Sequence, residues 1–315
     1  MKTLQAHLVE YIAARRALGT RLKEPAQTLR DFVSVLARKR SVHITTALAL
    51  EWSQQSKQVQ RATWARKLSM VRQFARWVHA IDPRHQIPPP RLLGSRHRRN
   101  PPHIYSDEEI AALMAEAGKV DSGKGMKSLN LETLIGLLAA TGLRPGEAFA
   151  LQRKDVDLQA GILMIRESKF GKSRQVPIHP STVMALKHYV RRRDQMFCHP
   201  GESCFFLSDH GTALDAGNVR IWFCQISRNC GLRKKSEGHR CGRGPRLQDL
   251  RHTFATRRLV EWYRARENVT LQLPKLSTYL GHSSVSCTYW YIQAVPELLA
   301  LATEFQLPSS RGGYS

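Results

Sequence analysis

Residues 131–147 read LETLIGLLAATGLRPGE, and this stretch decides the fold of the larger, C-terminal part of the chain. Its apolar side chains recur at the spacing of one helix face, at Leu131, Leu134, Ile135 and Leu138. Gly142 is typical of a helix end, and Pro145 favours the first turn of a second helix. Arg144 is therefore expected at an exposed helix junction, with Glu147 close enough to orient its side chain.

From residue 104 onward the pattern predicts helices around a small sheet. Ser106 and the three acidic residues after it are typical of a helix start. Two short strands, at 161–165 and 175–178, flank a polar turn at 168–174. Further helices are expected over residues 181–193, 218–230, 248–264, 276–280 and 295–305. The predicted fold class is mainly α with a small β-sheet (α+β), in a domain over 104–306 that is followed by a flexible tail at 307–315.

The N-terminal part has a different pattern, which predicts a separate helical domain over residues 1–81. Its strongest apolar stripe consists of Trp64, Leu68, Val71, Phe74, Ala75 and Val78. Prolines at 83, 88–90 and 101–102 break regular structure, so residues 82–103 are expected to form a linker between the two domains.

The charge of the chain predicts a polyanionic partner. The 315 residues include 49 Lys and Arg against 25 Asp and Glu, a net charge of +24. Residues 1–103 hold 20 basic and 5 acidic residues, a net +15, and nucleic acid is the polyanion that such a charge favours. The basic residues predicted to contact phosphates are Arg61, Arg66, Lys67, Arg72 and Arg76 in the helical domain and Arg96, Arg98 and Arg99 in the linker. The alternative is that they form an ordinary solvated surface.

Composition excludes several other classes of protein. A hydrophobic content of 42% is too high for a disordered polycation. The longest apolar run, of about ten residues, is too short to cross a membrane, and we expect no secretory signal and no membrane partner. Six scattered cysteines fit a reducing compartment, so a cytoplasmic location is predicted.

Four separated clusters carry residues suited to chemistry on a phosphodiester. They are ATGLRPGE at 140–147, a turn lysine at Lys169 followed by the strand RQVPI at 174–178, QDLRHTFAT at 248–256, and LGHSSVSCTYWY at 280–291. In this order and spacing they resemble the motifs of the tyrosine recombinases, the phage integrase family. The resemblance covers most of the chain: residues 1–81 resemble the family's helical core-binding (SAM-like) domain, and residues 104–306 its catalytic domain.

The resemblance implies a role for each motif residue, and the residue types fit these roles. Arg144 and Arg251 would donate paired hydrogen bonds to the non-bridging phosphate oxygens, whose charge grows in the transition state. His282 would add a further donor. Tyr291 would be the nucleophile that forms a 3′-phosphotyrosine, and Lys169 the general acid for the leaving 5′-oxygen.

Some assignments leave alternatives open. Lys172 is the fallback for the turn lysine, and Tyr289 is the alternative to the nucleophile, with one of the two tyrosines packing against its neighbours. Gln248 stands where the family usually has histidine; it can donate a hydrogen bond but cannot transfer a proton. Glu147 and Asp249 are expected to support the two arginines. Nine residues separate His282 from Tyr291, about 900° on an unbroken helix, so a helix break near Gly281 is required for both to reach one phosphate.

No cofactor and no metal are implied. The only grouping to consider for zinc, Cys224, Cys230, His239 and Cys241, lacks the paired cysteine spacing of structural zinc sites. The stretch around His239 fits a basic loop beside DNA better.

Together, the sequence predicts a site-specific recombinase, metal-independent, that integrates, excises or transposes a mobile element in a bacterial nucleoid. Its implied partners are duplex DNA recombination sites, on which the family works as a homotetramer at two sites, with related recombinases as alternative subunits. The apolar segment after Tyr291 is expected to dock on a neighbouring protomer or to pack on its own domain. The rival interpretations are a type IB topoisomerase-like enzyme and a DNA-binding accessory factor with reduced or lost catalysis.

Overall fold

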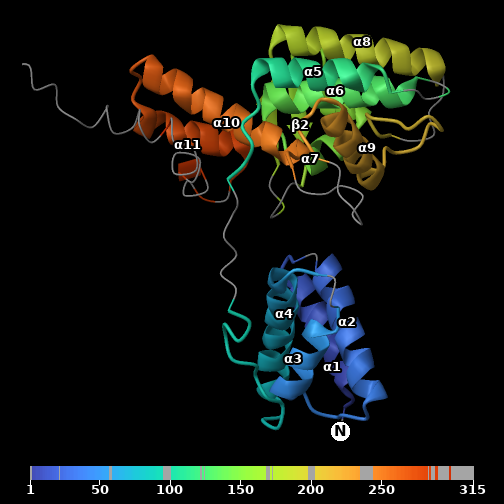
Figure 1. Cartoon of the computed structure of the whole chain (residues 1–315), viewed down its shortest axis with the longest axis vertical. Coiled ribbons are helices and arrows are strands. Elements are labelled where there is room, and N and C mark those ends of the chain that lie inside the picture. The colour runs from blue at the N-terminus through green and yellow to red at the C-terminus, as the bar shows by residue number, and fades with distance from the viewer. Residues whose placement is uncertain are drawn as a thin grey trace, which may run out of the picture. The chain divides into compact units, whose positions relative to one another are not determined.

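The structure is a computed structural model that divides into two compact units, Met1–Asn100 and Pro101–Ser315, each described here by itself (Figure 1). The residues that it describes are 2–20, 22–56, 59–94, 101–120, 123, 125–167, 171, 173–197, 203–234, 244–282, 284, 288–289 and 298.

The N-terminal unit is built from the helices expected over residues 1–81. They are α1 (Leu4–Ala17), α2 (Lys23–Arg38), α3 (Thr46–Gln54) and α4 (Arg61–His79). The hydroxyls of Thr3 and Thr45 accept hydrogen bonds from the first turns of α1 and α3 and so define where these helices start. Their shared core includes Phe32, Trp52 and Phe74. The apolar periodicity therefore predicted the helices of this unit.

Residues 82–94, expected as the first half of a linker, instead pack on the N-terminal unit. The imidazole Nδ1 of His85 accepts a hydrogen bond from the Ile44 backbone N–H at 3.0 Å, and the Gln86 N–H donates to the Ile44 carbonyl at 2.7 Å. Arg72 donates to the carbonyls of Pro88 and Pro89, both at 2.7 Å. Helix α4 ends before the prolines, as expected, but the carbonyls of Pro88 and Pro89 accept hydrogen bonds from α4 and hold this segment against it.

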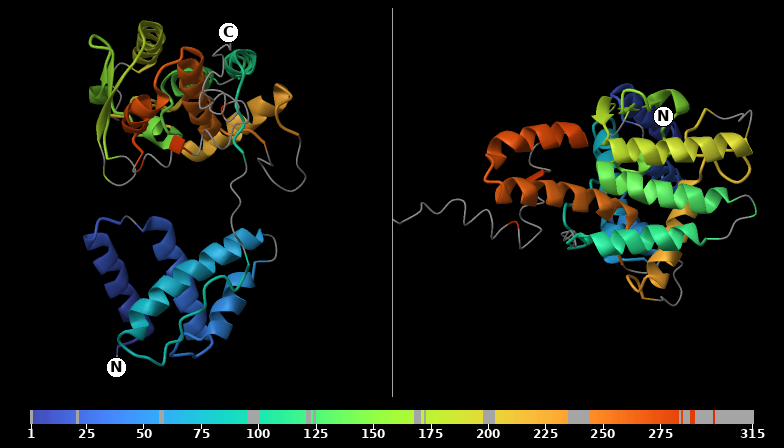
Figure 2. Two further views of the ribbon diagram at one scale, coloured as in Figure 1. Left: turned by 90° about the vertical axis from the view of Figure 1, so that its left-hand side faces the viewer. Right: turned by 90° about the horizontal axis from the view of Figure 1, so that it is seen from above.

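The C-terminal unit is organised around α6 (Met126–Thr141), which lies between α5 (Asp107–Gly118) and α8 (Pro180–Met196), as the right-hand view of Figure 2 shows. The same helix packs against α10 (Leu247–Arg264), which pairs with α11 (Val269–Leu280). Helix α9 (Ala216–Asn229) covers α5. Because α6 is surrounded, its buried residues include not only the apolar face predicted from the sequence but also Asn130, Leu137 and Thr141.

The sheet of this unit has three antiparallel strands in the order β1 (Val156–Asp157), β2 (Ile162–Ile165) and β3 (Arg174–Pro177). Ile165 pairs with Arg174 at the end of β2 and β3 that adjoins their connecting turn. Strands β2 and β3 were expected. Strand β1, only two residues long, follows a short 3₁₀ helix, η1 (Arg153–Asp155), and was not predicted.

Two glycines in the left-handed conformation end the helices that matter most for the site. Gly142 caps α6 with φ of 62° and Gly281 caps α11 with φ of 66°. After Gly142 the chain enters α7 (Pro145–Phe149). Helix α11 begins at Val269, seven residues before the predicted start at 276. The prediction missed its first turns because Pro274, which lies inside the helix, is normally a sign of a helix boundary. The break after Leu280 agrees with the helix break required between His282 and Tyr291.

The observed fold is mainly helical with a small sheet, which confirms the predicted class. Of the helices within the described ranges, none is both long and apolar enough to cross a membrane. Helix 295–305 and the tail 307–315 lie outside the described residues, except for Leu298. That residue is fully buried in a cluster with Leu259 and Leu273 of α10 and α11, so at this position the segment packs on its own unit.

We expect Gly142→Ala to lower the free energy of unfolding of the C-terminal unit. The left-handed conformation disfavours any other residue by about 1–2 kcal/mol, and a Cβ here would lie 2.5 Å from Cδ1 of Phe254. Gly146→Ala is the matched control, because a Cβ at Gly146 meets nothing within 4 Å. Urea denaturation checks this; equal stability for the two variants would contradict it.

Candidate active site

The buried carboxylate of Glu147 joins two of the arginines in the C-terminal unit. It accepts a hydrogen bond from Arg144 Nη1 at 2.7 Å and one from the Arg144 backbone N–H at 3.0 Å. Arg174, the first residue of β3, binds both carboxylate oxygens with its Nη1 and Nη2, at 3.1 and 2.9 Å. Residues from α7 and β3 are thereby held at one point.

Glu147 is ionised in this setting. Its side chain is 6% exposed, and burial alone raises the pKa of a carboxyl group. Here the hydrogen bonds and positive charges of Arg174 and Arg144 outweigh that effect and hold the pKa of Glu147 below its usual range. The carboxylate therefore stays charged and remains paired with the guanidinium groups of Arg144 and Arg174.

Main-chain carbonyls at two helix ends provide the other contacts of the arginines. Arg251 of α10 donates to the Gly142 carbonyl at 2.9 Å and to the Leu280 carbonyl at 2.7 Å. Arg144 Nη2 donates to the Gly281 carbonyl at 3.0 Å. The last carbonyls of a helix lack partners within the helix and carry a partial negative charge. The guanidinium groups therefore stabilise the C-terminal ends of α6 and α11. These contacts join three of the four sequence clusters, and the bonds of Arg174 to Glu147 add the strand of the remaining cluster.

The two arginines that the motifs single out differ in exposure. Arg251 is 1% exposed, whereas 23% of the Arg144 side chain is exposed. In this state Arg144 is therefore the member of the pair that presents surface to a ligand.

His282 follows directly on Gly281 and faces this arginine cluster. Its Nδ1 lies 2.8 Å from the hydroxyl oxygen of Thr288. Burial and the positive charges of Arg251, Arg144 and Arg174 lower the pKa of His282 to about 3. The imidazole is therefore neutral near pH 7, and a hydroxyl that donates to Nδ1 leaves Nε2 as an N–H donor.

The start of α10 is held by Asp249, which is 2% exposed. Its carboxylate accepts hydrogen bonds from the backbone N–H of Arg246 and from that residue's guanidinium, each at 2.9 Å. Gln248 lies half-buried on the same first turn. Asp249 thus supports the start of the helix that carries Arg251.

The described part of this cluster has an excess of positive charge. The carboxylate of Glu147 pairs with the guanidinium groups of Arg144 and Arg174. The guanidinium of Arg251 binds main-chain carbonyls at the adjacent helix ends, and His282 is neutral. Such a partly buried excess of positive charge favours an anionic ligand, and the forked guanidinium donors fit the oxygens of a phosphodiester.

Several predicted residues lie outside the described residues: Lys169 and its alternative Lys172, Tyr291, Arg96, Arg98 and Arg99. Tyr289, the alternative nucleophile, is described and is 45% exposed. Of the grouping considered for zinc, Cys224 is buried in α9 and Cys230 is partly buried, while His239 and Cys241 are outside the described ranges.

The basic residues of α4 do not form one uniform surface. Arg61 and Arg76 are exposed, Arg66 pairs with Glu24 at 2.7 Å, and Lys67 lies 5.3 Å from the centre of the Trp52 ring. Arg72 is a structural residue here, because its guanidinium holds the carbonyls of Pro88 and Pro89. The periodic pattern gave no sign of this, since the partners come from a segment expected to be a linker.

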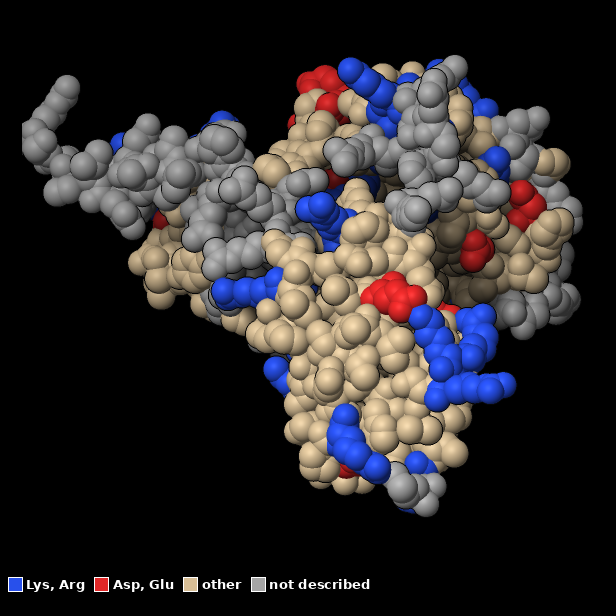
Figure 3. Space-filling view, turned by 60° about the horizontal axis from the view of Figure 1, so that its bottom comes forward, with Lys and Arg blue, Asp and Glu red and all other residues tan. Residues whose placement is uncertain are grey.

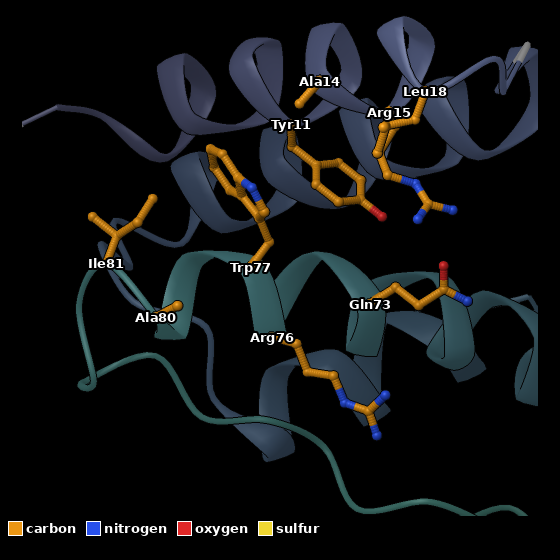
Figure 4. A pocket seen from close by; sticks show the side chains of 9 residues that line it. All are labelled: Tyr11, Ala14, Arg15, Leu18, Gln73, Arg76, Trp77, Ala80 and Ile81. Carbon is orange, nitrogen blue, oxygen red and sulfur yellow. The ribbon is translucent and has the colours of Figure 1, made fainter.

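Arg76 lies at the rim of a groove between α1 and α4, of about 770 Å³. Tyr11 and Trp77 project toward each other inside it, with ring centres 5.8 Å apart, while Arg76 extends away from them (Figure 4). On the face that Figure 3 shows, lysine and arginine side chains are widespread and acidic side chains are fewer.

Arg174 is the functional-site residue that the motifs did not single out. In the sequence it only marks the start of the second strand, and nothing near it indicates a carboxylate partner 27 positions earlier in the chain. Its position directly before an alternating apolar strand and after a polar turn was the one available signal.

The family model and the similar proteins all indicate the same family. Residues 104–297 match the sequence model of the phage integrase family. The chain is 44% identical over 303 residues to the proposed integrase/recombinase y4rB of Sinorhizobium fredii, which covers 95% of each chain. It is 27% identical over 314 residues to the tyrosine recombinase XerD of Caulobacter vibrioides, covering 98% of this chain and 95% of that protein.

Solved structures share the fold at lower identity. The Tn1549 transposon integrase in complex with transposon right end DNA matches with a TM-score of 0.67 and 15% identity, over 97% of this chain and 99% of that one. The XerH recombinase bound to its difH substrate matches with a TM-score of 0.61 and 20% identity, over 89% of this chain and 77% of that one.

We expect the His282 imidazole to stay neutral between pH 5 and 8 in the free protein. Its ¹⁵N resonances, assigned with a His282→Asn variant, should then show no titration in this range. Because the folded-state pKa is depressed, the stability that this neutral histidine supports is present above about pH 6.5 and is lost as the pH falls toward 3. A titration midpoint near 6.5 would contradict the buried, arginine-flanked placement.

Proposed function

The chain belongs to the phage integrase family of tyrosine recombinases, and from this premise we propose that it cleaves and rejoins DNA strands through a covalent 3′-phosphotyrosine intermediate. The observation that carries the proposal is the pairing of Arg144 and Arg174 with Glu147, with Arg251 on the adjacent helix-end carbonyls and neutral His282 next to Gly281. Its excess of positive charge and its forked donors fit the non-bridging oxygens of a scissile phosphate.

In the proposed reaction the hydroxyl oxygen of Tyr291 attacks phosphorus, its proton passes to solvent water, and a tyrosine–phosphate bond forms as the bond to the 5′-oxygen breaks. The leaving 5′-oxygen takes a proton from Lys169. Arg144 donates to the non-bridging oxygens with the part of its side chain that is exposed. Attack by a free 5′-hydroxyl on the phosphotyrosine reverses these steps and releases the tyrosine, so the bond energy is conserved for rejoining.

Arg251 contributes to the same phosphate only after a change of environment. It is 1% exposed and holds the Gly142 and Leu280 carbonyls, so we propose that DNA binding brings the phosphate against this face and opens access to its guanidinium. His282 donates from Nε2. Gln248, in the place of the family's usual histidine, orients a phosphate oxygen but transfers no proton, which predicts an active enzyme with a slower step at the tyrosine.

The partners and role that we propose follow from the relatives. We propose duplex recombination sites as partners and integration, excision or transposition of a mobile element as the role, which the integrase and recombinase names of the similar proteins support. A homotetramer on two sites is proposed from the family resemblance. We propose that the chemistry is metal-independent, since the arginines supply the positive charge at the phosphate, and that the protein acts at the bacterial nucleoid.

We expect Tyr291→Phe to bind duplex DNA as wild type does and to form no covalent adduct. The DNA is a duplex recovered by selection from a random pool for binding to the wild-type chain, then nicked so that cleavage releases a short strand and traps the adduct. Denaturing gel electrophoresis detects it. Tyr289→Phe is the matched control and should retain the adduct.

The same duplex separates the rival enzymes. An adduct formed by Tyr291→Phe would contradict the assignment of Tyr291 as the nucleophile. Failure of the wild-type chain to form an adduct would favour the interpretation as a non-catalytic DNA-binding protein. Exchange of strands between two labelled sites supports a recombinase, whereas relaxation of supercoiled DNA without exchange supports a topoisomerase.

In the N-terminal unit, Arg76→Gln should reduce the dependence of DNA affinity on salt, and Arg72→Gln should not. A phosphate contact contributes about 1 to the slope of log affinity against log salt concentration. Arg76 is exposed, but Arg72 is occupied by the Pro88 and Pro89 carbonyls. Fluorescence anisotropy between about 50 and 200 mM salt measures the slopes of both variants. A reduced slope for Arg72→Gln and not for Arg76→Gln would contradict the assignment of Arg76 as a phosphate contact.

A further inference from the structure

We propose that Arg174 is a positioning residue of this reaction, which sets the orientation of Arg144 and of the end of α11 without touching the DNA. The inference rests on the proposed function, because it concerns the geometry in which Arg144 and His282 meet a scissile phosphate. Arg174 lies outside the set of residues that the motifs predict to carry the chemistry.

The guanidinium of Arg174 contacts two separate elements at once. Its Nη1 and Nη2 bind the two oxygens of Glu147, at 3.1 and 2.9 Å, and its Nε donates to the Tyr279 carbonyl at 2.7 Å. Glu147 in turn binds Arg144 through both its side chain and its backbone. One side chain from β3 therefore fixes α7, which begins beside Arg144, and the last turn of α11, which ends beside His282.

Gly281 provides the space for this side chain. A Cβ at position 281 would lie 2.8 Å from Nη1 of Arg174, closer than real contacts allow. The carbonyl of the same glycine accepts the hydrogen bond from Arg144 Nη2. Arg174 and Arg144 thus both contact the backbone shortly before His282. A shift of Arg174 would therefore also displace Arg144 and His282, the two predicted phosphate donors.

Burial and geometry argue against a direct DNA contact by Arg174. Its side chain is 11% exposed, and its Nε, Nη1 and Nη2 each donate a hydrogen bond to the Tyr279 carbonyl or the Glu147 carboxylate. The forked, planar arrangement of donors is required for this set of bonds, since a lysine ammonium can reach the carboxylate or the carbonyl but cannot make the same paired contact. The charge of Arg174 alone is therefore not sufficient for its role.

The test compares DNA binding with the rate of cleavage for Arg174→Gln. With the nicked, selected duplex as probe, we expect unchanged salt dependence of DNA affinity and a single-turnover rate of adduct formation that falls on the order of 10²-fold at saturating DNA. Misplacement of a catalytic group by about 1 Å has that effect on rate. Arg174→Lys, which retains a positive charge opposite Glu147, should keep the fold and still lose most of the rate.

Two further comparisons separate positioning from general stability. Arg153→Gln removes a paired contact to Asp194, at 3.1 and 3.0 Å, in the same unit, and should leave the cleavage rate unchanged. The double variant Glu147→Gln/Arg174→Gln should react no more slowly than the slower single variant, because Arg174 acts through Glu147.

The outcomes have distinct meanings. Wild-type cleavage with equal cleavage by Arg174→Gln contradicts this inference and leaves the proposed function intact. A salt slope reduced by about 1 in Arg174→Gln shows a direct phosphate contact and also contradicts it. Effects that multiply in the double variant mean that Arg174 acts independently of Glu147, and this result also contradicts the inference. No adduct from the wild-type chain contradicts the proposed function, and this inference with it.

Discussion

A buried carboxylate between two guanidinium groups is the interaction on which the site depends. Glu147 is nearly inaccessible to water, and a buried ionised carboxylate is stable only when it is paired and hydrogen-bonded. Arg174 and Arg144 provide that pairing from two different directions. Because the charge is costly to leave unpaired, the carboxylate holds strand β3 and helix α7 in one relative position, and the other contacts of the site follow from this position.

The helix ends complete the arrangement. Gly142 and Gly281 end α6 and α11 in left-handed turns, which directs carbonyl groups toward Arg251 and Arg144. The arginines thus have two functions at once: they stabilise the protein's own partial negative charges and present positive charge to an anion. The same charges keep His282 neutral, which suits it as a hydrogen-bond donor and makes it a poor source of a proton.

Much of this was accessible from the sequence, and the exceptions have physical reasons. The junction at Gly142–Glu147 was predicted because a glycine end, a proline start and an i, i+3 carboxylate are all local signals. Arg174 and Arg72 were not recognised, because their partners lie far away in the chain and an arginine gives no local sign of which carbonyl or carboxylate it will bind. Strand β1 is too short to show alternation, and Pro274 concealed the first turns of α11. The assignments of Lys169 and Tyr291 stay predictions, since both lie outside the described residues.

The most direct measurement of the central claim is a crystal structure of the Tyr291→Phe variant bound to the intact, selected duplex. We expect Arg144 and Arg251 both to donate to non-bridging oxygens of one phosphate, at about 2.7–2.9 Å. We also expect both arginine contacts of Glu147 to persist and Arg251 to become accessible on that face. A phosphate bound away from Arg144, or a complex in which Glu147 has lost Arg174, would contradict it.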